Sequence, residues 1–162
     1  QTCALPISTA APPPPSLLTD SIIDAVTLNA YTPLGPGSII TISGDNFAES
    51  TATAAKGSLP AQLQTARVVM ASNAVEISLP LFSVAPRQIQ ALVPPTAAPG
   101  SYSLWIVRGE SPSNRVPVTI APYAPGIFTA NNSGRGLGVF FKDDGSVVSA
   151  SDRKSTRLNS SH

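Results

Sequence analysis

The stretch Pro36-Gly37-Ser38-Ile39-Ile40-Thr41-Ile42-Ser43-Gly44-Asp45-Asn46-Phe47 decides the fold, because it reads as turn, strand and turn. Pro36-Gly37 is a turn pair, and the Asp45-Asn46 pair after Gly44 tolerates a left-handed turn. Between them Ile40 and Ile42 alternate with polar residues, as in a strand with one apolar face. Phe47 can then turn back toward a core. The stretch therefore predicts the opening strand of a β-domain.

The same alternation recurs along the chain between closely spaced prolines. Proline inside a helix costs about 3 kcal/mol, so this spacing leaves little room for long helices. Residues 101–107 are apolar on both faces toward their end, which predicts a more central strand, whereas Pro117 indicates an edge or a bulge. Inward positions are predicted at Ala66, Val68 and Met70, at Val75, Ile77 and Leu79, and at Val116, Val118 and Ile120. Many short strands joined by turns predict an all-β sandwich.

The two ends of the chain are related by their codons rather than by folding. Residues 1–7 back-translate to CAG ACG TGT GCT CTT CCG ATC, whose reverse complement encodes residues 152–158. A DNA adapter ligated to both ends of a fragment produces this relationship. We therefore expect residues 1–7 and 152–162 to be translated adapter and exclude them from fold reasoning.

This exclusion changes the chemistry available to the domain. The only cysteine, Cys3, and the only histidine, His162, lie in the excluded ends. Residues 8–151 then offer no Cys or His for catalysis, disulfides or metal binding, and we expect no cofactor and no metal. Residues 8–151 contain seven basic and eight acidic residues, so nucleic-acid binding has little support. They contain no apolar run long enough to span a membrane.

Composition divides residues 8–151 into three segments. Residues 8–20 contain the run Ala11-Pro12-Pro13-Pro14-Pro15-Ser16 and are predicted to be a stiff linker, with a ligand for a proline-recognition domain as the rival interpretation. Residues 21–121 are predicted to be the β-sandwich. Residues 122–151 are predicted to be a junction and the first hairpin of a truncated second β-domain, because Asp144-Gly145 between apolar segments is a strong hairpin signal. One hairpin alone is marginally stable.

Several motifs together resemble a known family. The stretch 36–47 resembles the opening of an IPT/TIG domain, an immunoglobulin-like module. Residues 79–94, the turn Pro99-Gly100-Ser101-Tyr102 and the stretch Ala124-Pro125-Gly126-Ile127-Phe128-Thr129 resemble an uncharacterised C-terminal domain family of acidobacterial secreted and surface proteins. The family usually has Asn-Gly where this chain has Asn73-Ala74, and Gln-Ile-Asn at 88–90. The resemblance implies an immunoglobulin-like sandwich and no catalytic residues.

Candidate acid/base and ligand motifs all have a simpler structural interpretation. Asp143-Asp144 fits a turn better than a catalytic or metal pair, and Asp45-Asn46 fits turn capping better than calcium binding, which needs six or more oxygens. Residues 134–138, Gly-Arg-Gly-Leu-Gly, precede a predicted strand rather than a helix, so a lead-in to a hairpin is favoured over a phosphate loop. Asn131-Asn132-Ser133 matches a glycosylation sequon.

Aromatic residues support one binding hypothesis. Trp105 and Tyr102, with Tyr31 and Tyr123, could form a flat platform on which sugar rings stack. The alternative is core packing of Trp105, as in many sandwiches. A platform requires Trp105 to be exposed beside another exposed aromatic residue.

These observations predict a non-catalytic structural or interaction module of a larger bacterial extracellular or cell-surface protein, which spaces or presents neighbouring domains and contributes to adhesion. The expected partners are neighbouring domains of the same chain, and proteins or glycans beyond them. The alternative functions are a carbohydrate-binding accessory module of a secreted enzyme and a fragment of an enzyme whose site lies elsewhere in the protein.

Overall fold

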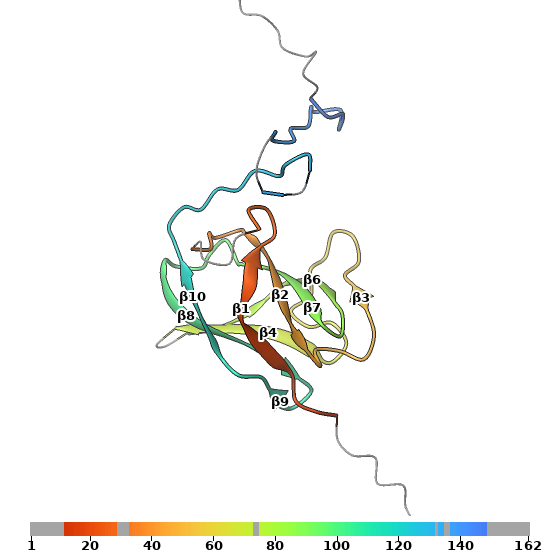
Figure 1. Cartoon of the computed structure of the whole chain (residues 1–162), viewed down its shortest axis with the longest axis vertical. Helices are drawn as coiled ribbons and strands as arrows, with labels where there is room; N and C mark the ends of the chain where they lie inside the picture. The colour runs from red at the N-terminus through yellow and green to blue at the C-terminus, as the bar shows by residue number, and fades with distance from the viewer. Residues whose placement is uncertain (1–11, 29–32, 73–74, 132, 135–136, 149–162) are drawn as a thin grey trace, which may run out of the picture.

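The computed structural model describes residues 12–28, 33–72, 75–131, 133–134 and 137–148. Within these residues ten strands form two antiparallel sheets that pack against each other, which confirms the predicted all-β sandwich (Figure 1). Across the same ranges the structure contains no helix long and apolar enough to cross a membrane.

The two sheets divide the chain between them. In the first sheet the order of strands is β1 (Ser16–Asp24), β2 (Ile39–Asp45), β7 (Gln88–Leu92), β6 (Leu81–Val84) and β3 (Ala52–Thr53). In the second sheet the order is β10 (Val116–Ile120), β8 (Gly100–Arg108), β4 (Ala66–Ser72) and β5 (Val75–Leu79), and β9 (Ser111–Pro112) pairs with β8. Pro117 therefore lies in an edge strand, and residues 101–107 lie in a central one, as predicted.

The turn after β2 shows why the strand ends at Asp45. Asn46 adopts a left-handed conformation with φ 62°, which reverses the chain and brings Phe47 into the core with none of its surface exposed. Phe47 packs directly over Gly44, where an added β-carbon would overlap both the Phe47 ring and the Ser16 carbonyl oxygen. The sequence Gly-Asp-Asn-Phe is therefore a packing unit as well as a turn.

Side chains from both sheets form one core. The predicted inward positions of β2 and β4 are buried, but the edge strands β5 and β10 are less regular: Leu79 and Ile120 are buried, whereas Val75 is 56% exposed. Edge strands have a neighbour on one side only, so their ends are less completely covered. The largest fully buried side chains are Phe47, Ile40, Ile42, Met70, Leu79, Leu81, Ile89, Leu104, Ile106, Ile120, Val68 and Val69.

Strand β1 begins inside the range predicted to be linker. Ser16 and Leu17 pair with Asp45 and Gly44, and the register shifts before Ile22, around Asp20 with φ 63°. The side-chain amide of Asn114 accepts a hydrogen bond from the Leu17 amide at 2.7 Å and donates one to the Leu17 carbonyl at 3.0 Å. The Asn114 side chain thus pairs with the Leu17 backbone as a residue of a neighbouring strand would, and it fixes the point where the chain enters the sandwich.

Beyond β10 the chain forms a small meander, defined here as residues 127–148. The Phe128 carbonyl accepts a hydrogen bond from Val139, and the Phe140 carbonyl accepts one from Val148, so three short segments lie antiparallel. The predicted hairpin around Gly145 is present, with a bridge between Phe141 and Val147. The large apolar side chains of the meander are exposed, namely Ile127, Phe128, Leu137, Phe140, Phe141, Val147 and Val148.

Replacing Phe47 by alanine tests whether the turn residue is a core residue. We expect Phe47→Ala to lower the free energy of unfolding by about 3–5 kcal/mol, because it leaves a cavity between the sheets. Phe128→Ala removes a side chain that is 51% exposed and should cost only about 0.5 kcal/mol. Urea unfolding followed by the fluorescence of Trp105 measures both, and equal losses would contradict this assignment.

Candidate functional site

The two residues predicted to stack on sugars lie on opposite faces of the same strand. Tyr102 and Trp105 are three residues apart in β8, and successive side chains of a strand point to opposite faces. Tyr102 belongs to the core between the sheets, is 7% exposed, and donates a hydrogen bond from its hydroxyl to the Ala98 carbonyl at 2.9 Å. The structure therefore does not bring the two rings together as a platform.

Trp105 instead forms a small second apolar cluster on the outer face of the second sheet. It packs with Val69 and Val107, which neighbour it across and along the sheet, and only 7% of its surface is exposed. The Arg115 guanidinium lies 4.1 Å from the centroid of the Trp105 ring. This cation–π contact covers the face on which a sugar would stack, so stacking would require Arg115 to move.

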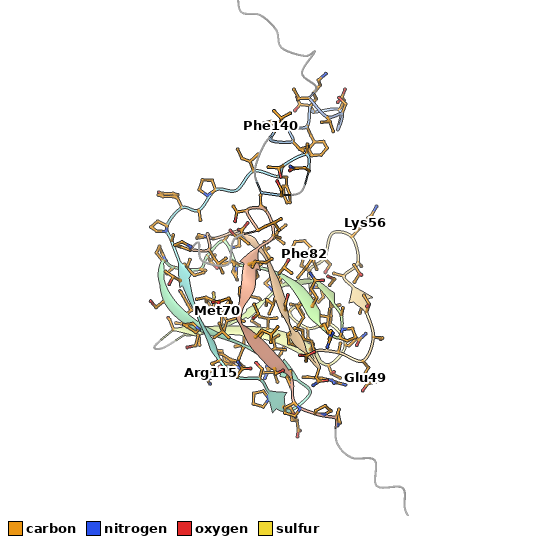
Figure 2. All side chains as sticks on the ribbon, in the orientation of Figure 1. Glu49, Lys56, Met70, Phe82, Arg115 and Phe140 are labelled. Atoms are coloured by element: carbon orange, nitrogen blue, oxygen red, sulfur yellow. The ribbon has the colours of Figure 1, made fainter. Side chains whose placement is uncertain are left out.

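A shallow groove of about 490 Å³ lies beside this contact on the same sheet. Its lining is mostly small or polar, and Arg115 contributes the cationic group; the other lining residues are Ala71, Ser72, Ser101, Tyr102, Ser103 and Pro117. Figure 2 shows Arg115 at the edge of the sandwich. The groove offers hydrogen-bonding groups, but the ring of Trp105 remains covered by the Arg115 guanidinium.

The carboxylates that could have served a metal or a reaction have structural partners. Asp45 pairs with the Arg87 side chain at 2.9 Å, and the next residue, Asn46, adopts the left-handed conformation of the turn. Glu49 pairs with Arg108 at 3.0 Å. Within the described ranges no group of three or more His, Cys, Asp or Glu side chains could hold a metal ion.

Asp144 acts as a turn residue, in agreement with the preferred interpretation of Asp143-Asp144. Its carboxylate accepts hydrogen bonds from the Ser146 hydroxyl at 2.6 Å and the Ser146 amide at 2.8 Å. These bonds lower the pKa of Asp144 below its ordinary value. A lowered pKa means that the carboxylate supports the turn above its unfolded-state pKa, and this support is lost as the pH falls through the folded-state value.

Two glycines of the glycine-rich segment, Gly134 and Gly138, lie within the described residues. Gly134 has φ 69° and contacts Thr27, while Gly138 pairs with Thr129 in the meander. No helix begins in residues 138–148, all of which the structure describes. Asn132 of the sequon, Tyr31 and the Asn73-Ala74 turn lie outside the described residues.

Sequence reasoning missed the contacts of two polar residues, Arg115 and Asn114. Arg115 immediately precedes β10, where Val116 pairs with Leu104, so the register places Arg115 beside Trp105. Only the strand pairing reveals this neighbourhood. Asn114 bonds to a residue 97 positions away, and a single sequence gives no signal for such a contact.

Comparison with known families agrees with this architecture. Residues 21–120 match the model of the IPT/TIG domain, which covers most of the chain. A search of curated proteins gave no match.

Removing Arg115 tests whether its guanidinium shields Trp105. Trp105 is the only tryptophan, so its acrylamide quenching reports this site alone. We expect Arg115→Ala to increase the quenching constant and to lower the free energy of unfolding by about 0.5–1 kcal/mol. Arg87→Ala, which removes the partner of Asp45, is the matched control and should leave the quenching unchanged. Unaltered quenching in Arg115→Ala would show that other groups cover the ring.

Proposed function

The chain belongs to the IPT/TIG domain family, and from this premise we propose that it is a non-catalytic module that spaces or presents neighbouring domains of a larger bacterial extracellular or cell-surface protein. Domains of this family are immunoglobulin-like, generally non-catalytic and common in extracellular proteins. The spacing role and the location on a bacterial surface go beyond these family properties and are our proposal.

The observation that carries the proposal is where the chain enters and leaves the sandwich. The chain enters the sandwich at Leu17, where Asn114 holds it, and leaves at Ala121, whose amide bonds to the Leu34 carbonyl at 2.8 Å. The start of β1 and the end of β10 lie at opposite ends of the sandwich (Figure 1). Domains attached to this chain would therefore be held apart along one axis, with the sandwich between them.

The packing of the aromatic residues favours this role over carbohydrate binding. Tyr102 is part of the core, and Trp105 lies under Arg115. A sugar-stacking module instead needs aromatic faces open to solvent. The ion pairs of Asp45 and Glu49 likewise support structural roles for these carboxylates over catalytic ones. Adhesion through another surface is compatible with the spacing role.

The meander supports a second element of the proposal, that residues 122–151 begin a further β-domain. Three short segments expose phenylalanine, leucine and valine side chains, as one sheet of a sandwich does before a second sheet packs against it. The motif Ala124-Pro125-Gly126-Ile127-Phe128 supports membership of the acidobacterial C-terminal domain family. The codon complementarity supports an adapter origin for residues 1–7 and 152–162, and sequencing of the source gene tests this origin.

Distance measurements between the two ends of the sandwich test the spacing role. Spin labels at Leu18→Cys and Tyr123→Cys, two positions that are 56% and 89% exposed, would be introduced in a Cys3→Ser background. We expect one narrow distribution on the order of 30 Å, the length of a nine-residue strand. A broad distribution, or a short distance that places both ends together, would contradict the proposal.

Binding to insoluble polysaccharides distinguishes the alternative function. We expect the full chain not to be retained on cellulose or chitin. Retention that is lost in Trp105→Ala but kept in Phe128→Ala would instead favour the carbohydrate-binding module. Phe128 is the matched control because it is an exposed aromatic residue of the meander.

A further inference from the structure

The meander and the segment that leads into it contact the loop at residues 25–28, so the meander does not extend freely from β10. A β-carbon added at Gly134 would overlap the Thr27 carbonyl oxygen, and one added at Gly126 would lie 2.9 Å from a methyl group of Val26. Real β-carbons do not approach other atoms so closely. At position 134 only glycine permits this contact with backbone, and at position 126 any larger residue would press on the Val26 side chain.

The loop that receives these glycines is held in place by a buried carboxylate. Asp24 is 4% exposed, and its Oδ1 accepts hydrogen bonds from the Val26 amide at 2.8 Å and the Thr27 amide at 2.9 Å. The Asp24 carbonyl accepts a further bond from the Leu28 amide at 2.9 Å. The loop therefore presents the Thr27 carbonyl in one position.

The meander side of the contact is held in a similar way. Thr129 is 6% exposed, and its hydroxyl oxygen accepts hydrogen bonds from the amides of Ser133 and Gly134, both at 3.1 Å. These bonds fix the turn that carries Gly134 toward Thr27. Both partners are thus ordered by a side chain that bonds to its own local backbone.

Packing between the meander and the sandwich is incomplete. A cleft of about 370 Å³ remains between the two parts, lined by Thr27, Pro125, Gly126, Ile127, Thr129, Gly134, Gly138 and Phe140. Because the cleft separates the two parts, the orientation of the meander depends on the close approach at Gly126 and Gly134. A single added methyl group at either position should therefore disrupt it.

We propose that Val26 and Thr27 form with Gly126 and Gly134 a fixed joint, which holds residues 127–148 in one orientation relative to the sandwich. This inference rests on the proposed presentation of a neighbouring domain and specifies that the presentation is directional. The surface that the joint orients is apolar: Phe140 and Phe141 are 55% and 66% exposed, and Phe140 lies beyond the sandwich in Figure 2. The partner that fits this surface is an apolar face of a further β-layer.

Spin labels on the two sides of the joint test it in the full chain. Glu76→Cys labels β5 and Asp143→Cys labels the meander, both exposed positions, in a Cys3→Ser background. We expect a single narrow distance distribution, and we expect Gly134→Ala to remove the narrow peak in favour of a broad distribution. Gly126→Ala should do the same without strain from a left-handed backbone.

Gly145→Ala is the matched control. Gly145 also lies in the meander with φ 80°, close to the 69° of Gly134, but no atom lies within 4 Å of an added β-carbon. We expect Gly145→Ala to keep the narrow distribution. A narrow peak in both Gly126→Ala and Gly134→Ala, an equal loss in Gly145→Ala, or a broad distribution in the reference chain would overturn the joint.

Failure of the joint and failure of the spacing role can be told apart. The Leu18 and Tyr123 labels both lie outside the meander that the joint orients, so their distance distribution should remain narrow in Gly134→Ala. The unfolding midpoint reported by Trp105 fluorescence should also be unchanged. If both distributions broaden together and the midpoint falls, the sandwich itself has been damaged, and a joint that acts independently of it is excluded.

Discussion

Burial of two apolar sheet faces against each other is the interaction on which the rest of this structure depends. Ile40 and Ile42 of the first sheet are fully buried, as are Met70 and Leu104 of the second. Each such side chain contributes about 1.5–3 kcal/mol. A chain with one cysteine cannot form an internal disulfide, and the described residues contain no metal-binding cluster. Packing of these side chains in one cluster is the interaction that holds the two sheets together.

Local patterning explains which parts of the fold could be predicted. Alternation placed Ile40, Ile42 and Met70 on the core face, and the rules for proline placed Pro117 in an edge strand. Strand β1 was missed because polar residues and a left-handed Asp20 interrupt its alternation. Local sequence rules also could not predict the surroundings of Trp105, because the side chain that covers its ring, Arg115, comes from the neighbouring part of the sheet.

The arrangement of ends and surfaces connects this packing to the proposed role. A sandwich stabilised by its core can carry one attachment at Leu17 and another at Ala121 without using either sheet face for binding. The buried Asp24 carboxylate then orders the loop on which the meander rests. Stability and presentation are thus served by different residues, so that substitutions at the joint need not weaken the core.

Native-state hydrogen exchange of the full chain tests the central claim most directly, because it reports the stability of each backbone amide. If the sandwich core carries the stability, the slowest amides will lie in β2, β4, β7 and β8 and exchange together by global unfolding, whereas amides of residues 127–148 will exchange faster. The account is contradicted if the slowest amides lie in the meander, or if the two sheets exchange as independent units.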